Sequence, residues 1–418
     1  MSRQITTLLL FSGALWALQA MAADDAIDQL DDLLTFSSAD AKVRGRISGT
    51  VELEGYWFQQ PAPAFIDASG GALFNPRVTT FLDVQAGPRV YAFAQARMDR
   101  GFDPSEDALR GRLDEYAIRL TVLGEGQVSL QAGKFATVVG NWVARHAAWD
   151  NAFVNAPLPY ENLTGIWDEV AARNSTILLG WAHVRPRAVA GVPATDKYLR
   201  LPIIWGPSYA TGVAVSGELG KATYAWELKN APLASRPEAW EAEDLYFRHP
   251  TVSGRIGYTP NLMWNFGLSA STGAYLLPVA ISTLPATAGI GDYREVVMAQ
   301  DARFAWHHLQ LWAEVFETRF TIPRVGNART YAYYVEGRYK ITPQWFGAVR
   351  WNEQWFSRIP DPLTGSSPWG NDVWRIDVAS GYRFTPHTQW KIQYSRQHEV
   401  RGAREFLYLW STQLLIRF

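Results

Sequence analysis

Six side chains that can bind a polar solute lie close together in the middle of the chain. They are Trp142, Arg145, His146, Trp149, Asp150 and Asn151. Aromatic rings stack on the apolar faces of sugars, while arginine, aspartate and asparagine hydrogen-bond hydroxyl groups. A pore for anions requires instead that its arginines are unpaired and clustered at the narrowest point. The segment therefore contains the parts for a path taken by small saccharides or by small anions.

Catalytic chemistry has little support in the sequence. The histidines are His146, His183, His249, His307, His308, His387 and His398, and none lies in a nucleophile motif or in a zinc motif such as His-Glu-x-x-His. The absence of cysteine excludes disulfides and thiolate metal sites. We therefore expect a protein that is not an enzyme, with no catalytic residue, no metal site and no cofactor.

Charged residues recur at every second position along many stretches of the chain. Between residues 42 and 57, Ile47, Val51 and Leu53 alternate with Arg46 and Glu52. This period of two predicts strands with one apolar and one charged face. If the apolar face turns outward, the interior receives Arg44, Arg46, Arg77, Asp83, Arg89, Arg97, Asp99, Glu115, Glu336, Arg338, Arg375 and Asp377. The same orientation also places in the interior Glu52, Glu54, Arg119, Arg255, Asp301, Arg303, Glu314, Arg350, Arg383, Lys391 and Glu399.

Two arrangements of these interior charges are open. Guanidinium groups on one wall facing carboxylates on the other would create a transverse field that orients polar solutes. Alternatively, the charges satisfy one another in a network of salt bridges. Because thirteen bases face ten acids, most arginines are expected to be compensated.

The connections between these strands alternate between tight turns and mostly longer loops. Seven tight turns occur near Gly87, Gly124, Gly220, Pro260, His307, Pro343 and Pro386. Short turns on one side and long loops on the other are typical of an up-and-down transmembrane β-barrel. The pattern predicts an all-β antiparallel barrel of about 16 strands over residues 42–418. Eighteen strands is the alternative, with a further hairpin around residues 175–184.

Both ends of the chain indicate an exported protein. Arg3, an apolar run over 8–18 and Ala20-Met21-Ala22 predict a signal peptide over residues 1–22. Residues 23–41 place Ile27, Leu30 and Leu33 at helical spacing, which predicts a short periplasmic amphipathic helix or a frayed lead-in.

The last strand, residues 405–418, carries most of its apolar and aromatic residues on one face and ends at Phe418. It resembles the C-terminal insertion signal of Gram-negative outer-membrane β-barrels. The resemblance implies a location in the bacterial outer membrane, contact with its lipid and lipopolysaccharide, and recognition by the barrel-assembly machinery.

The composition supports this class and excludes others. Aromatic residues make up 14% of the chain, with 19 tryptophans, as expected for two interfacial belts. The net charge of −1 gives no support to nucleic-acid binding. After the leader, no apolar run reaches the ~20 residues that a membrane helix needs. A helical membrane protein is therefore excluded.

The strand that ends in Gly133-Lys134-Phe135 is followed by a long aromatic loop, and this arrangement resembles porins. In porins the third outer loop folds into the lumen and narrows it, which would place residues 139–168 at a constriction. Alternatively, this loop caps the outer mouth or packs on a neighbouring subunit, for example in a homotrimer.

We therefore expect a channel for passive diffusion of small hydrophilic solutes, with weak charge selectivity. The alternatives are a polysaccharide export conduit resembling the alginate-export barrels, or a closed structural or adhesive barrel. A dense arginine ladder with few acids would favour polyanion export. The mixed charges of the interior favour the diffusion channel.

Overall fold

The computed structural model describes residues 25–100, 109–124, 126–183, 200–236, 247–400 and 405–418. The predicted signal peptide, residues 1–22, lies outside this described part. The strands of the barrel are β2 (Val43–Phe58), β3 (Ala72–Ala86), β4 (Val90–Asp99), β5 (Arg110–Leu123), β6 (Val128–Phe135), β7 (Ala210–Leu219), β8 (Ala222–Lys229), β9 (Thr251–Tyr258), β10 (Trp264–Ala274), β11 (Arg294–Trp306), β12 (Leu309–Ile322), β13 (Gly326–Lys340), β14 (Trp345–Phe356), β17 (Val373–Arg383), β18 (Thr388–Glu399) and β19 (Leu407–Arg417).

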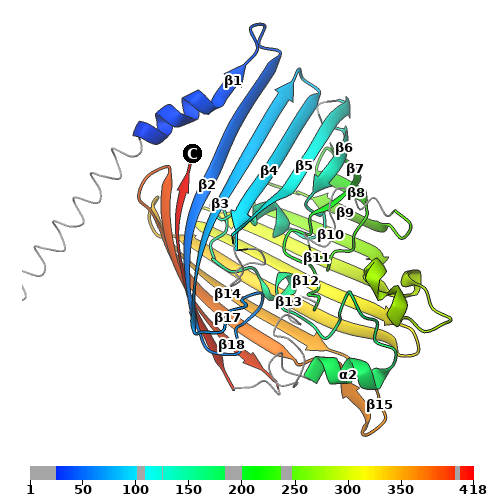
Figure 1. Cartoon of the computed structure of the whole chain (residues 1–418). Helices are drawn as coiled ribbons and strands as arrows, with labels where there is room; N and C mark the ends of the chain where they lie inside the picture. Colours follow the sequence, from blue (N-terminus) through cyan, green and yellow to red (C-terminus); the bar gives the residue numbers. More distant parts are fainter. Residues whose placement is uncertain (1–24, 101–108, 125, 184–199, 237–246, 401–404) are drawn as a thin grey trace, which may run out of the picture.

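These strands form a closed antiparallel ring (Figure 1). Each strand pairs with its neighbours in sequence order, and β19 pairs with β2 from Leu409 opposite Phe58 to Arg417 opposite Thr50. The ring contains 16 strands within the described residues, which confirms the predicted barrel. Closure pairs the two outermost strands of the chain and so leaves no open sheet edge along most of the barrel.

The alternative of 18 strands is wrong. Within the stretch 175–184, where a further hairpin was considered, the structure has the helix α2 (Ser175–His183). A short apolar run such as Ile177-Leu178-Leu179 fits a strand or a helix equally well by periodicity.

Within the described residues, no helix is long and apolar enough to cross a membrane.

One end of the barrel carries the tight turns, which include the described residues 87–89, 124, 126–127, 220–221, 259–263, 307–308, 341–344 and 384–387. The opposite end carries most of the long connections, including the hairpin of β15 (Arg358–Asp361) and β16 (Gly365–Pro368). In outer-membrane barrels the short turns face the periplasm. We therefore call the end with the tight turns the periplasmic end.

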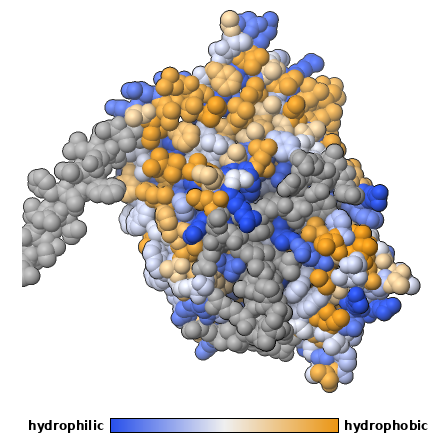
Figure 2. Space-filling model, viewed as in Figure 1, coloured by the Kyte–Doolittle hydropathy of each residue, from blue (hydrophilic) through white to orange (hydrophobic). Residues whose placement is uncertain are grey.

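Burial alternates along the strands as the sequence predicts. On β13 and β14, Val335 and Val349 are 47% and 50% exposed, whereas Glu336 and Arg350 are fully buried. Apolar side chains cover much of the outer surface, including its upper part, where β2 to β5 lie (Figure 2). The apolar face therefore turns outward and the charged face lines the interior.

A helix over residues 25–34 precedes the barrel and leads into β1 (Thr35–Ser37). β1 pairs with the first residues of β2, Thr35 lying opposite Arg46. Asp31 of the helix accepts a hydrogen bond of 2.9 Å from Arg46 Nε, and Asp28 lies 2.9 Å from His387. The predicted N-terminal helix is thus present, and it is attached to the periplasmic end by two ionisable contacts.

Candidate functional site

The segment after β6 turns back against the inner wall of the barrel (Figure 1). It contains two short 3-10 helices, η1 (Val143–Arg145) and η2 (Leu158–Tyr160). The backbone N–H of Val154 donates to Gln393 on β18 at 2.7 Å, and that of Leu158 donates to Asn352 on β14 at 3.2 Å. Both acceptors are buried, inward-facing side chains. We call residues 136–168 the inner loop.

An apolar cluster holds one half of the inner loop against β11 to β13. The loop's members pack against residues of those strands and of two neighbouring connections, so this side of the interior is filled. The cluster comprises Val139, Trp142, Val143, Tyr160, Ile203, Ile204, Leu233, Val297, Ala299, Trp312, Phe316, Ala332 and Tyr334. Trp142, a candidate for solute contact, is therefore 5% exposed and serves in this packing.

Arg145 is bound to the wall. Its Nη1 lies 2.6 Å from Glu336 Oε1, its Nη2 donates to Tyr334 Oη at 3.2 Å, and its guanidinium lies 4.4 Å from the centre of the Trp312 ring. Burial lowers the pKa of Arg145, but the adjacent Glu336 carboxylate outweighs this effect and raises it. The side chain is therefore charged and its charge is neutralised locally.

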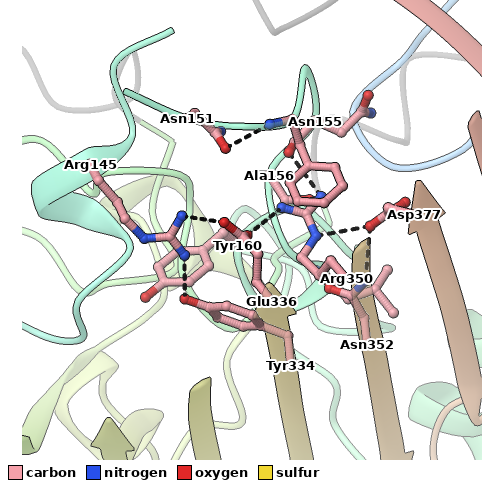
Figure 3. Close-up of polar contacts among 12 residues, drawn as sticks. Arg145, Asn151, Asn155, Ala156, Tyr160, Tyr334, Glu336, Arg350, Asn352 and Asp377 are labelled. Carbon is pink, nitrogen blue, oxygen red and sulfur yellow. Dashed lines mark hydrogen bonds and ion pairs between the residues drawn. The ribbon is translucent and has the colours of Figure 1, made fainter. Parts of the chain in front are cut away.

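Arg350 joins the inner loop to two strands (Figure 3). Its Nε lies 2.9 Å from Asp377 Oδ2, and its Nη1 lies 3.4 Å from Glu336 Oε2. Its Nη2 donates to the carbonyl oxygens of Asn155 and Ala156 at 3.0 and 3.1 Å. A single guanidinium thus ties the loop backbone to β13 and β17, with its donors directed at oxygens as burial of a charge requires.

Arg375 makes a second connection of this kind. Its Nε lies 3.0 Å from Asp377 Oδ1, its Nη2 donates to the Ala156 carbonyl at 2.6 Å, and its Nη1 pairs with the Glu161 carboxylate. The charges that were expected on the strands, Glu336, Arg350, Arg375 and Asp377, therefore form one buried network with the inner loop. Its function is to fix the loop.

Glu314 on β12 binds the beginning of the inner loop. Tyr160 Oη donates to Glu314 Oε2 at 2.7 Å, and the backbone N–H of Trp142 donates to Oε1 at 3.1 Å. Gly140 lies directly beside this carboxylate with a φ of +80°. A Cβ at this position would lie 2.4 Å from Tyr160 Oη and 2.7 Å from Glu314 Oε1, so only glycine fits.

His146 is held in the neutral state. Its ring nitrogens lie 2.6 Å from the Val143 carbonyl oxygen and 2.8 Å from Tyr209 Oη. Burial lowers its pKa from the ordinary value. His146 faces the cavity described below but does not add a charge to it.

The remaining candidates of the loop lie nearer the periplasmic end. Trp149 is 9% exposed, and the guanidiniums of Arg417 and Arg383 lie 4.0 and 5.0 Å from its ring centre. The carboxylate of Asp150 is exposed, whereas Asn151 is buried and its Oδ1 accepts the Phe153 N–H at 3.1 Å. Of the six candidates, Asp150 thus remains the most accessible.

The opposite wall carries a separate charge network. Arg77 lies 3.4 Å from Glu52 and 3.6 Å from Asp99, and Arg97 lies 3.2 Å from Asp99 and 3.1 Å from Asp114. This network also acts electrostatically on the inner loop, because Arg97 and Asp114 both influence the pKa of the His146 imidazole. It compensates the arginines of β3 and β4 with carboxylates of β2, β4 and β5.

Four other expected lumen charges lie at the periplasmic end. Arg44 and Arg89 are exposed, Arg46 binds Asp31 of the N-terminal helix, and Asp83 accepts a hydrogen bond from Tyr91 Oη. They are not brought together with the inner loop. The expectation of one continuous field across a constriction therefore has no support from these four residues.

A cavity of about 880 Å³ lies between the inner loop and the wall of β4 to β9. Its polar lining includes Glu115, which accepts the Ala136 N–H at 2.7 Å, and Arg119, whose guanidinium donates to Gln131 Oε1 at 3.0 and 2.8 Å. Ala144 and Ala147 of the loop face it and are exposed. Within the described residues, no group of three or more histidines or acids is arranged to hold a metal ion.

The sequence matches no protein-family model and no curated protein sequence. Solved structures share its fold at low sequence identity. The outer-membrane channel DcaP of Acinetobacter baumannii gives a TM-score of 0.56 at 9% identity, over 92% of this chain and 99% of that one. This chain has the fold of the porin-type outer-membrane β-barrels.

Two further solved structures of outer-membrane proteins share the fold to a similar degree. The anion-selective porin from Comamonas acidovorans gives 0.52 at 9% identity, over 90% of this chain and 100% of that one. The trimer form of OmpT from Vibrio cholerae gives 0.53 at 7% identity, over 90% and 99%. The expected fold is thereby confirmed, and the expected location, the bacterial outer membrane, is that of this class of barrel.

Sequence reasoning missed several inward charged residues of this porin-type barrel, among them Glu227 and Lys229 on β8 and Arg112 and Asp114 on β5. The register between β4 and β5 shifts at Gln95, so that Gln95 lies opposite Glu115 and Ala96 opposite Leu113. This β-bulge turns the consecutive residues Asp114 and Glu115 both inward, against the period of two. Two adjacent acids in an otherwise alternating strand are the one sequence signal that could have indicated it.

Proposed function

We propose that this barrel is a channel through which small hydrophilic solutes diffuse passively, with weak charge selectivity. The observation that carries the proposal is the cavity of about 880 Å³ beside the inner loop, whose lining mixes acidic, basic and neutral polar side chains. Such a lining can replace part of the hydration of a polar solute without binding it tightly. The inner loop sets the width of this path.

Pairing of the interior charges supports weak selectivity. Arg77, Arg97, Arg145, Arg350 and Arg375 all lie within salt-bridge distance of carboxylates. A conduit for a polyanion would need a run of uncompensated bases along its length. Polysaccharide export is therefore the weaker alternative. The part of the interior with paired arginines suits small neutral solutes, including saccharides.

Planar-bilayer recording tests conduction directly. We expect discrete single-channel steps in symmetrical salt, whereas a closed structural barrel would give none. The absence of native cysteine permits a labelling test without background. Modification of Ala147→Cys by a bulky methanethiosulfonate should reduce the step size, because Ala147 is exposed to the cavity.

The matched control is Ala152→Cys, on the same loop but 1% exposed. It should not react. Unchanged conductance after complete labelling of Ala147→Cys would place the inner loop outside the conduction path.

The outer surface has one face suited to contact with another copy, and the trimer form of OmpT from Vibrio cholerae leads us to propose a homotrimer. Among exposed large apolar residues, Phe74 is the one aromatic on the described strands β3 to β7, whereas β8 to β14 carry many, among them Trp226, Tyr258 and Trp306. Interfacial aromatics anchor surfaces that meet lipid headgroups. A face with few of them is suited to contact with another subunit, and the rest of the surface to lipid and lipopolysaccharide.

Native mass spectrometry in detergent tests this homotrimer. Ala94→Trp, on the outer face of β4, should shift the population toward monomers. Ala313→Trp, on the outer face of β12, should leave it unchanged. A monomeric wild type would overturn the proposal.

A further inference from the structure

The inward arginines near the periplasmic end differ from those in the middle of the barrel in their cross-strand partners. In the middle, Arg77 lies opposite Glu52, and Arg350 lies opposite both Glu336 and Asp377. At three positions near the periplasmic end the residue opposite arginine is instead a glutamine. The pairs are Arg119 with Gln131, Arg338 with Gln310, and Arg383 with Gln389.

Each of these pairs is joined by hydrogen bonds. Arg338 Nε donates to Gln310 Oε1 at 3.0 Å, and Arg383 Nε donates to Gln389 Oε1 at 3.0 Å. A glutamine amide fixes the orientation of a guanidinium but does not neutralise it. The positive charge at these positions is therefore oriented and left uncompensated by the partner strand.

Two of these arginines, Arg338 and Arg383, meet a third, Arg417, at Trp149 of the inner loop. Arg417 and Arg383 lie 4.0 and 5.0 Å from its ring centre, and Arg338 Nη1 donates to the carbonyl oxygen of the next residue, Asp150, at 3.3 Å. Within the described residues, none of the three lies in salt-bridge contact with a carboxylate. Their mutual repulsion is opposed by the Trp149 ring, which attracts cations at its face.

These arginines also retain free hydrogen-bond donors. In the described part of the chain, Arg383 uses Nε toward Gln389, and Arg417 uses Nε toward the Pro386 carbonyl at 2.8 Å. Each guanidinium has five N–H donors, so the terminal amino groups of both remain available. Arg383 is partly exposed and Arg417 is exposed, so a solute in the lumen can reach them.

From this geometry we propose that Arg338, Arg383 and Arg417, arranged around Trp149, form a binding site for small oxyanions at the periplasmic end of the lumen. Carboxylate, phosphate and sulfate groups share the planar or tetrahedral oxygens that guanidinium forks bind in pairs. The site rests on the proposed channel function and adds a solute class to it. The middle of the barrel, where arginines are paired with carboxylates, admits small polar solutes in general. The site around Trp149 retains those solutes that carry an oxyanion group.

Asp150 is the acid that opposes such a ligand. Its carbonyl binds Arg338, while its exposed carboxylate makes no hydrogen bond or ion pair within the described residues. A bound oxyanion would be repelled by this carboxylate. Asp150→Asn should therefore strengthen binding, an effect that misfolding would not produce.

The experiment measures binding of inorganic phosphate to the full-length barrel in detergent micelles, by isothermal titration at constant ionic strength. Arg383→Gln and Arg417→Gln together should weaken phosphate binding at least tenfold, and Asp150→Asn should strengthen it about threefold. The matched control is Arg44→Gln, which removes an exposed arginine that also lies opposite a glutamine, Gln85, at the periplasmic end but away from the inner loop. Heat-modifiable gel mobility checks that each variant is folded.

Binding in micelles does not require conduction, so a barrel that binds phosphate but gives no current refutes the channel and leaves the site intact. A conducting barrel that binds no phosphate refutes the site alone. Equal weakening by Arg44→Gln would show that the total charge of the periplasmic end, and not the group around Trp149, attracts the anion. Sulfate and acetate, titrated in parallel, identify which oxyanion group the site prefers.

Discussion

Arg350 and Asp377 form an ion pair of 2.9 Å, with both side chains fully buried, between the adjacent strands β14 and β17. The same guanidinium holds the backbone of Asn155 and Ala156. Replacing Arg350 with Met leaves Asp377 with Arg375 as its remaining charged partner. We expect a loss of about 3–5 kcal/mol in the free energy of unfolding, measured by denaturant titration in micelles.

An exposed ion pair provides the control for this prediction. Arg329 and Glu317 lie 3.8 Å apart on the outer surface with side chains 45% and 42% exposed. Arg329→Gln should change the free energy of unfolding by less than about 1 kcal/mol. If both variants lost the same amount, burial would not be the source of the effect.

Substitution of Gly140 should detach the start of the inner loop. Gly140→Ala combines a positive φ with a Cβ that would overlap Tyr160 Oη and Glu314 Oε1. The strain of a left-handed residue alone costs about 1–2 kcal/mol. We expect reduced stability and noisier single-channel current.

Gly111→Ala is the matched variant, because nothing lies within 4 Å of a Cβ at Gly111. It should behave as wild type in both measurements. If the Gly140→Ala variant had wild-type stability and wild-type current noise, this result would contradict the close packing around Glu314.

Acidification should weaken the contacts of His146. Burial lowers the pKa of its imidazole below the ordinary 6.5, so the unfolded state binds the proton more readily than the folded one. The contribution of this residue to stability is therefore present above pH 6.5 and decreases as the pH falls through and below that value.

NMR of ¹⁵N-histidine-labelled protein, with the His146 signals assigned from the His146→Gln variant, checks this sign. The imidazole should remain neutral at pH 6.5. A midpoint above 6.5 would reverse the prediction.

A charge added to the inner loop should alter ion selectivity. Arg145→Glu should move the reversal potential in a salt gradient toward cation preference, since charges at a narrow point are weakly screened over a few ångströms. Because Arg145 pairs with Glu336, Ala147→Glu is a second variant that adds a carboxylate without breaking an ion pair. Reversal potentials unchanged in both would exclude the loop from the path of the ions.

The fold was predictable because the alternation of apolar and charged residues is visible within each strand's own sequence. Alternation of Val335 with Glu336, or of Val349 with Arg350, determines which side meets lipid, and tight turns determine the order of the strands. The rule failed at Asp114, where a bulge breaks the alternation. It also failed at residues 175–183, where a run of apolar residues has no period of two.

The partners of the charges could not be predicted in the same way. Arg145 meets Glu336, 191 residues further along the chain, only because the inner loop turns back into the barrel. That path depends on the combined packing of Val139, Trp142 and Tyr160 against several strands. The sequence identified Trp149 and Arg383 as separate candidates, but their contact requires both the loop and the register of β17.

In each Arg–Gln pair of the periplasmic end, the partner of the guanidinium is a neutral amide that does not ionise. A carboxylate partner would have lost its charge in strongly acidic surroundings and thereby changed the field at the mouth. The orientation of the guanidiniums by these amides is thus insensitive to the acidity of the medium around the cell.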